Sequence, residues 1–186
     1  MKIGILALQG AFLEHEKMLE TLNTNFFEIR NKTDAEKDFD GLILPGGEST
    51  VQRKLLFDLN IFSVLKEKID KNIPVLATCA GLILLSQKIS NDSNITFGTL
   101  PIEVKRNAYG RQPGSFHFEG NVKNIGNFPM EFIRAPIIQS VFDKTEVLSE
   151  TKGIISGVKY KNQLGFTFHP ELTDNNSIHK YFLSLV

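Results

Sequence analysis

Cys79, the only cysteine of the chain, has the surroundings of a catalytic nucleophile. Residues 74–78 form a largely apolar run that is typical of a buried strand, and the small residues Ala80 and Gly81 open an expected helix. A side chain in such a strand–turn–helix connection projects from the carboxyl edge of a sheet, where open α/β folds bind ligands. The helix amino terminus would favour a thiolate, and the N–H of Ala80 would face a developing oxyanion.

His169 is the best candidate for the base that a thiolate needs. Along residues 163–171 apolar and polar side chains alternate, and His169 and Glu171 fall on the polar positions. Residues two apart share a face of an extended chain, and Pro170 keeps this stretch out of a helix. The pattern predicts that Glu171 holds one imidazole nitrogen while the other faces Cys79. The alternative is a half-buried strand end with a solvated glutamate.

A second candidate element is the turn Pro-Gly-Gly-Glu-Ser-Thr at residues 45–50. It follows an expected parallel strand, so it should open at the same sheet edge as Cys79, with the N–H of Gly47 as a second oxyanion donor. The simpler interpretation is a turn and helix cap, with Ser49 or Thr50 as the capping residue. A Walker phosphate loop is excluded, because no Gly-Lys-Ser/Thr follows.

The three other histidines suggest no chemistry. His15 shares a predicted helical face with Phe12 and Leu19, which favours core or interface packing. His117 lies in an alternating strand, and His179 has no acidic or nucleophilic neighbour in the sequence. We therefore expect no metal site.

Composition excludes several classes of protein. The 186 residues carry 21 basic and 21 acidic side chains, so the electrostatic footprint of a nucleic-acid or polybasic membrane protein is absent. One cysteine excludes an internal disulfide and a cysteine-based structural zinc site. No apolar run approaches the ~18 residues of a membrane span, and the short amino-terminal run lacks a cleavage site. We expect a cytoplasmic protein with a single domain over residues 1–186.

The predicted fold is α/β: a three-layer, flavodoxin-like, mostly parallel sheet with helices on both faces and an antiparallel extension. Strands and helices alternate in the first half, whereas the second half reads as strands that we expect to extend the same sheet. The expected strands are 2–8, 25–29, 39–44, 74–78, 99–105, 115–122, 131–133, 146–149, 153–160 and 163–168, and the expected helices are 11–22, 51–59, 62–71, 82–85 and 176–185.

Taken together, these motifs resemble the glutaminase subunits of pyridoxal 5'-phosphate synthases, which are triad-type (class I) glutamine amidotransferases. The resemblance runs nearly end to end, and departures are small: Ala77 stands where glycine is expected, and Tyr109 where phenylalanine is common. The motifs that carry it are Leu-Gln-Gly-Ala at 8–11, the Pro-Gly-Gly-Glu-Ser-Thr turn, Thr-Cys-Ala-Gly-Leu at 78–82, Arg-Asn-Ala-Tyr-Gly-Arg-Gln at 106–112, Phe-Ile-Arg-Ala-Pro at 132–136 and Phe-His-Pro-Glu-Leu-Thr at 168–173.

The resemblance implies that Cys79 attacks the side-chain amide of L-glutamine, that His169 moves protons and that Glu171 orients His169. Ammonia would pass to a separate (β/α)₈ synthase subunit in a hetero-oligomer, with no cofactor on this chain. The substrate contacts that it implies are Gly47, Glu48, Ser49, Arg106, Ile133 and Arg134. An arginine suits the α-carboxylate of glutamine, and whether Arg106 or Arg134 binds it stays open here.

Two other functions remain to be distinguished. One is a glutaminase that serves a different biosynthetic pathway, such as imidazole glycerol phosphate synthesis. The other is a non-catalytic sheet domain in which Cys79 senses oxidants or the Gly-Gly turn binds a phosphate. A sensor needs neither His169 nor Glu171, whereas hydrolysis needs a base.

Overall fold

The computed structural model describes residues 1–90, 92–106 and 115–186. Most of the motif at residues 106–112, including Tyr109, therefore lies outside the described residues. Five parallel strands form the half of the sheet that carries Cys79, in the order β2-β1-β3-β4-β12. Their bounds are β1 (Lys2–Leu6), β2 (Asn25–Ile29), β3 (Gly41–Leu44), β4 (Val75–Thr78) and β12 (Gln163–Phe166).

The second half of the chain extends the same sheet, as predicted, and the antiparallel pairing begins beyond β12, which itself pairs parallel with β4. β11 (Ile154–Tyr160) pairs antiparallel with β12, and β9 (Ile137–Val141), β6 (Leu100–Lys105) and β5 (Ser86–Ile89) follow. β10 (Glu146–Thr151) pairs antiparallel with residues 154–159 of β11, which overlap the part of β11 that pairs with β12.

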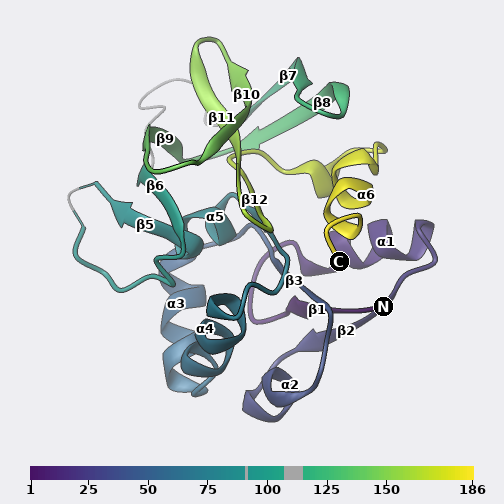
Figure 1. Ribbon diagram of the computed structural model, residues 1–186, viewed down its shortest axis with the longest axis vertical. Helices are drawn as coiled ribbons and strands as arrows, with labels where there is room; N and C mark the ends of the chain where they lie inside the picture. The colour runs from purple at the N-terminus through teal and green to yellow at the C-terminus, as the bar shows by residue number, and fades with distance from the viewer. Residues whose placement is uncertain (91, 107–114) are drawn as a thin grey trace.

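One expectation about the sheet is wrong. β7 (Ser115–Val122) and β8 (Gly126–Ile133) form a separate two-stranded sheet instead of joining the large one. The reason is visible in the core: buried Phe128, Met130 and Phe132 on β8 pack, with Phe166 and Phe168, over one face of the main sheet. The hairpin thus covers the sheet as a layer, as Figure 1 shows above β12.

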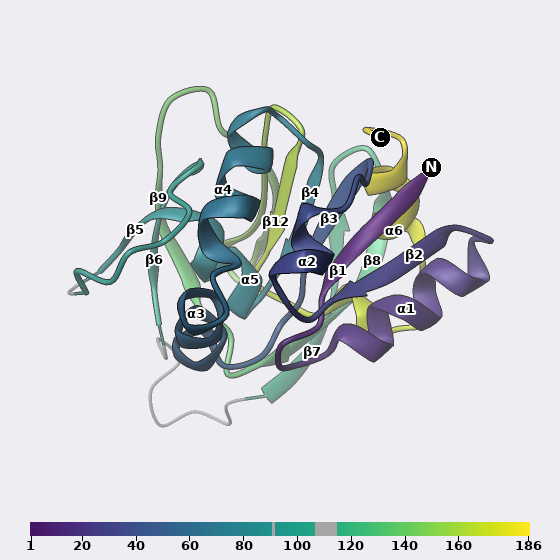
Figure 2. The ribbon, with the colours of Figure 1, turned by 90° about the horizontal axis from the view of Figure 1, so that it is seen from below.

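Alternation along the central strands explains the three layers. Ile43 and Leu76 point to one face of the sheet, and their neighbours Leu44 and Ala77 point to the other. Helices α1 and α6, with the β7–β8 hairpin, cover the first face, while α2, α3, α4 and α5 cover the second (Figure 2). The helices are α1 (Phe12–Thr21), α2 (Lys32–Glu36), α3 (Ser49–Asp58), α4 (Phe62–Asp70), α5 (Ala80–Leu85) and α6 (Ser177–Leu183).

Of the α-helices and strands described, three were not predicted from the sequence: α2, β5 and β9. Each is only four or five residues long, and α2 consists mostly of polar residues without an apolar face. Among the residues described, no helix is long and apolar enough to span a membrane.

Candidate active site

Cys79 lies in the sharp connection between β4 and α5, as predicted. Its backbone has φ 46° and ψ −101°, a region that non-glycine residues rarely enter, and such strain gathers at functional sites. The N–H of Cys79 donates to the carbonyl of Phe166 on β12 at 2.9 Å, which holds the turn in place. Helix α5 approaches β3 so closely that position 81 requires a glycine. A Cβ on Gly81 would lie 2.0 Å from the carbonyl oxygen of Leu44.

Ala77, the departure from the expected glycine, fits without displacing the turn. It is fully buried and lies directly opposite Gly165 of the neighbouring strand β12. Because Gly165 has no side chain, the extra methyl group finds room on that face of the sheet.

His169 reaches Cys79 because their strands are parallel neighbours. Thr78 at the end of β4 is in register with Phe166 at the end of β12, so the residues that follow emerge at one edge. The expected strand to residue 168 is too long, since β12 ends at Phe166 and Pro170–Leu172 form a 3₁₀ turn, η1. Proline at the first position of this turn fixes its geometry. The predicted pairing still forms: His169 Nδ1 lies 2.7 Å from Glu171 Oε1, with both residues buried.

The environment of His169 favours the protonated ring. Burial alone would lower the pKa, but hydrogen bonds to Cys79 and Glu171 raise the pKa of His169 to about 10. Burial would raise the pKa of Glu171, yet His15 and His169 beside the carboxylate bring it below its usual value. A protonated imidazole between a sulfur and a carboxylate is the arrangement that nucleophilic attack by sulfur uses.

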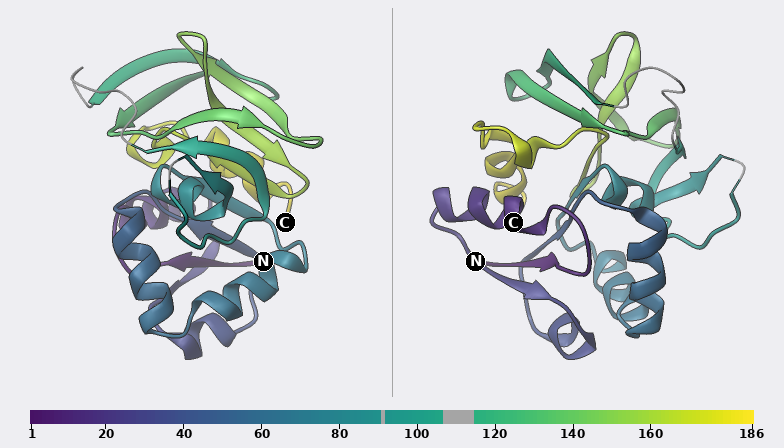
Figure 3. Two further views of the ribbon diagram at one scale, coloured as in Figure 1. Left: turned by 90° about the vertical axis from the view of Figure 1, so that its left-hand side faces the viewer. Right: turned by 180° about the vertical axis from the view of Figure 1, so that it is seen from behind.

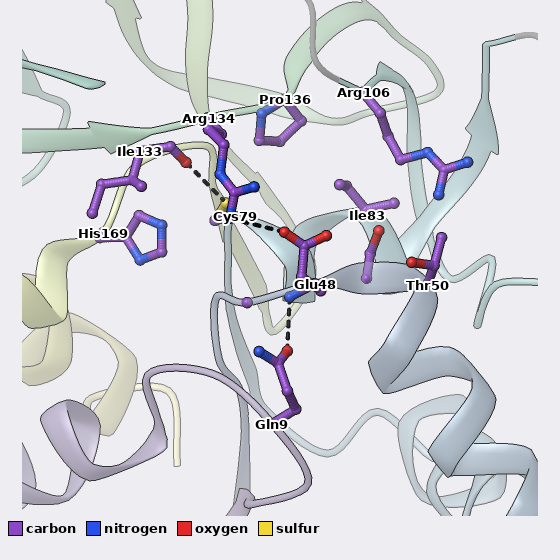
Figure 4. Close-up of a pocket in the computed structure, with 12 residues that line it drawn as sticks. Gln9, Glu48, Thr50, Cys79, Ile83, Arg106, Ile133, Arg134, Pro136 and His169 are labelled. Atoms are coloured by element: carbon purple, nitrogen blue, oxygen red, sulfur yellow. Dashed lines mark hydrogen bonds and ion pairs between the residues drawn. The ribbon is translucent and has the colours of Figure 1, made fainter. Parts of the chain in front are cut away.

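A pocket of about 430 Å³ opens over Cys79 and His169 (Figure 4). All six predicted substrate contacts line it: Gly47, Glu48, Ser49, Arg106, Ile133 and Arg134. Four further lining residues were not predicted, namely Gln9, Thr50, Ile83 and Pro136. Two further predicted site residues, Ala80 and Glu171, do not line the pocket. Both are buried: Ala80 at the start of α5, and Glu171 against Nδ1 of His169.

Charged side chains surround the pocket opening. Arg134, which follows β8, lies 2.9 Å from Glu48 Oε1 (Figure 4), and Arg106 is ion-paired with Asp92. Cys79 Sγ lies 3.9 Å from the carbonyl oxygen of Ile133. The pocket therefore combines a sulfur nucleophile with both signs of charge, which suits a zwitterionic ligand.

The Gly-Gly turn is held by two glutamines. The N–H of Glu48 donates to Gln9 Oε1 at 2.7 Å, and Gln52 Nε2 donates to the backbone carbonyl of Gln9 at 2.8 Å. The position of Gln9 just after β1 could have indicated its place, because β1 ends at the same sheet edge. The capping interpretation is wrong, because α3 is preceded by Glu48 at the cap position, without a side-chain cap, and Ser49 and Thr50 line the pocket.

Two other histidines lie closer to the site than the sequence indicates, although His15 packs in the core as predicted. His15 and His179 are both fully buried, yet His15 Nδ1 lies 2.9 Å from His179 Nε2 and His15 Nε2 lies 3.5 Å from Glu171 Oε2. These contacts could not be predicted, because His15 is far from both His179 and Glu171 in the sequence. Within residues 1–90, 92–106 and 115–186, no three His, Cys, Asp or Glu side chains are grouped so as to hold a metal ion.

Comparison with known proteins identifies the family of the chain. The model of the SNO glutamine amidotransferase family matches residues 5–186. A pyridoxal 5'-phosphate synthase subunit PdxT from Desulfitobacterium hafniense (strain Y51) is 56% identical over 186 residues, covering 100% of this chain and 94% of that protein. PdxT from Haemophilus influenzae (strain PittEE) is 50% identical over 188 residues, covering 100% and 98%.

Solved structures show the same fold. A crystal structure of a glutamine amidotransferase superposes with a TM-score of 0.93 at 37% identity, covering 98% of this chain and 97% of that one. PurLQS from Thermotoga maritima, at 15% identity, shares the fold with a TM-score of 0.71, covering 98% and 97%. With a family match over nearly its whole length, this chain belongs to the SNO glutamine amidotransferase family.

Proposed function

We propose that this chain hydrolyses the side-chain amide of L-glutamine, with Cys79 as nucleophile, His169 as proton carrier and Glu171 as the group that orients His169. The observation that carries the proposal is the buried 2.7 Å contact between His169 Nδ1 and Glu171. It leaves Nε2 of His169 for the sulfur of Cys79, at the floor of a pocket with charges of both signs.

The reaction balances with these three side chains and water. The thiolate of Cys79 attacks the amide carbon, and His169 gives its proton to the amide nitrogen, so that the C–N bond breaks and ammonia leaves. A glutamyl thioester remains on Cys79. Neutral His169 then takes a proton from water, which attacks the thioester; the C–S bond breaks, and glutamate leaves. Glu171 stays ionised throughout and stabilises the imidazolium.

Two backbone groups are proposed for the oxyanion. The first is the N–H of Ala80, which begins α5 directly after Cys79 and is one of the helix N–H groups without an intrahelical partner. Gly47 lines the pocket opposite, with φ +156°, at the start of the segment that leads into α3. One such donor typically contributes about 10²–10³ in rate.

The charged rim is proposed to bind the amino-acid end of glutamine. Glu48 carries the charge that an α-ammonium group needs, and Arg106 and Arg134 carry the charge for the α-carboxylate. Ser49 and Ile133 line the same pocket and complete the predicted contacts.

The product ammonia is proposed to serve pyridoxal 5'-phosphate synthesis. The relatives at 50–56% identity are subunits of that synthase, which supports a hetero-oligomer of this chain with a synthase subunit. We propose, from the family resemblance alone, that this partner has the (β/α)₈ fold. We propose a single glutamine amidotransferase domain over residues 1–186, acting in the cytoplasm, where a catalytic thiol stays reduced.

Ammonia release from glutamine, measured with and without a purified synthase subunit, tests the function. Cys79→Ala should abolish release in the complex, and His169→Ala should lower it by about 10²–10⁴. His117→Ala is the matched control, because His117 is exposed and bonded to Glu119 and Glu131 on the β7–β8 hairpin. Parental ammonia release by Cys79→Ala contradicts the mechanism, and full activity of His169→Ala favours a sensor domain. Failure to form pyridoxal phosphate with an active glutaminase would favour another pathway.

A further inference from the structure

Two buried histidines stand behind the proposed triad in an otherwise apolar layer. His15 on α1 and His179 on α6 are both fully buried, with ring centroids 5.1 Å apart and a 2.9 Å contact between His15 Nδ1 and His179 Nε2. Helices α1 and α6 lie side by side on the same face of the sheet (Figures 1 and 3). Burying a polar side chain in an apolar layer costs free energy unless the side chain is hydrogen-bonded, so the partners of both histidines decide what they do there.

His15 touches both oxygen-bearing side chains that support the triad. Its Nε2 lies 3.3 Å from Thr78 Oγ1 and 3.5 Å from Glu171 Oε2. The other carboxylate oxygen, Glu171 Oε1, faces His169 at 2.7 Å and the Thr78 hydroxyl at 3.4 Å. Glu171 Oε2, the oxygen that points away from His169, has no hydrogen bond among the described residues, and His15 Nε2 lies beside it at 3.5 Å.

The hydrogen-bond inventory assigns the protons. The Thr78 hydroxyl donates to Glu171 and accepts the N–H of Gly46 at 3.0 Å, so its contact with His15 requires a proton on His15 Nε2. Nδ1 of a neutral His15 then accepts from His179 Nε2–H. This leaves His179 Nδ1 bare, in agreement with its lack of a hydrogen-bond partner among the described residues.

Burial supports neutral rings at both positions. It is the largest influence on each of them, lowering the pKa of His15 below its usual value and the pKa of His179 to about 3. The charged or titratable groups that act on His15 are Glu171, His169 and Glu14, besides His179.

We propose that His15 is a positioning residue for glutamine hydrolysis: its Nε2–H bonds the Thr78 hydroxyl, which donates to Glu171, and lies beside the Glu171 carboxylate, and so fixes the imidazole of His169 against Cys79. His179 fixes the tautomer of His15 from the other side. His15 itself does not line the pocket and contacts no substrate. The inference rests on the proposed glutaminase function.

Two amide variants separate the contacts of His15. In His15→Gln the amide nitrogen reaches about as far as Nε2 and can still donate to Glu171 and Thr78. In His15→Asn the shorter amide reaches only toward His179. In the complex with the synthase subunit, we expect His15→Asn to lower kcat about 10- to 100-fold, the range for a buried acceptor that is left without its donor. KM for glutamine should stay within about twofold, because the pocket lining is unchanged, and His15→Gln should recover most of kcat.

Leu19→Ala is the control for loss of stability. Leu19 is fully buried on the same helix but belongs to the apolar cluster, so its truncation loosens α1 without removing a donor. The acid limb of the kcat profile should move to higher pH in His15→Asn, because a carboxylate without its donor is protonated more easily, and should stay in place in Leu19→Ala.

Unchanged kcat and acid limb in His15→Asn would overturn the inference, as would a folded His15→Gln that is no more active than His15→Asn. The proposed function fails in a different way, namely if the parental complex releases no ammonia from glutamine.

Discussion

Gly46→Ala should disable the site while sparing the fold, because Gly46 lies against the imidazole of His169. A Cβ on Gly46 would stand 2.2 Å from Cε1 and 2.7 Å from Nδ1 of that ring. Ordinary van der Waals contact starts near 3.4 Å, so the ring or the turn must give way by about 1.2 Å. The backbone of Gly46 does not have a positive φ, so alanine brings no conformational strain of its own.

The turn is held from both sides, and the ring must therefore absorb most of the displacement. The N–H of Gly46 donates to Thr78 Oγ1 and its carbonyl accepts from the N–H of Ala11, each at 3.0 Å. Moving His169 stretches its bond to Glu171 and misaligns the nitrogen that faces Cys79. Since a misplacement of about 1 Å at a reacting group costs on the order of 100-fold, kcat should fall by about that factor.

The assay is steady-state ammonia release from glutamine in the complex, with thermal unfolding recorded for each variant. Gly153→Ala is the matched control: Gly153 lies in the turn between β10 and β11 with φ +77°, and a Cβ there meets nothing within 4 Å. It brings backbone strain of about 1–2 kcal/mol without touching the site. The steric reasoning is refuted if Gly46→Ala keeps kcat within about twofold of the parent while Gly153→Ala does the same.

Two further substitutions test the groups around Glu171. Thr78→Val keeps the shape of the side chain but removes a hydroxyl that bonds Gly46, His15 and Glu171; kcat in the complex should fall about tenfold or more, and parental kcat would show that the hydroxyl is idle. His179→Phe should make the free energy of unfolding fall less steeply as the pH is lowered. Because the pKa of His179 is about 3 in the fold against 6.5 when exposed, the unfolded chain gains a proton below pH 6.5 that the native chain does not bind. Urea unfolding is measured at pH 7 and at pH 5, and between these two values the free energy of unfolding of the parent should fall by roughly 2 kcal/mol more than that of the variant. If the parent and the variant lose the same free energy, His179 is protonated in the fold.

The local parts of the site could be predicted from the sequence. An apolar strand that ends in Thr78-Cys79 and runs into small residues has few other conformations open to it, and the turn and short helix appear as expected. Two strands were also located well: residues 25–29 and residues 115–122, the latter with clear alternation, have the predicted bounds. These features depend on neighbours within about ten residues, which a sequence pattern contains.

Contacts between distant residues could not be predicted in the same way. The β7–β8 hairpin forms from local pairing, but its placement over the main sheet depends on Phe166 and Phe168, which come more than thirty positions later. His15 and His179 are separated by 164 positions. On α1, His15 occupies a buried position that an apolar residue would usually fill. The helical pattern around His15 does not indicate that Glu171 lies next to it in the fold.

The buried row from His179 to Glu171 is better explained by catalysis than by stability. Buried polar groups that are fully paired contribute little net free energy, and apolar residues of similar shape often replace them without loss. In this row the pairing is incomplete, because His179 Nδ1 has no hydrogen-bond partner among the described residues. An apolar side chain at position 15 would fit the surrounding cluster of Leu19, Ile178 and Phe182. What it could not do is hold the carboxylate that faces His169, and a carboxylate free to rotate would leave the imidazole without a fixed direction toward Cys79.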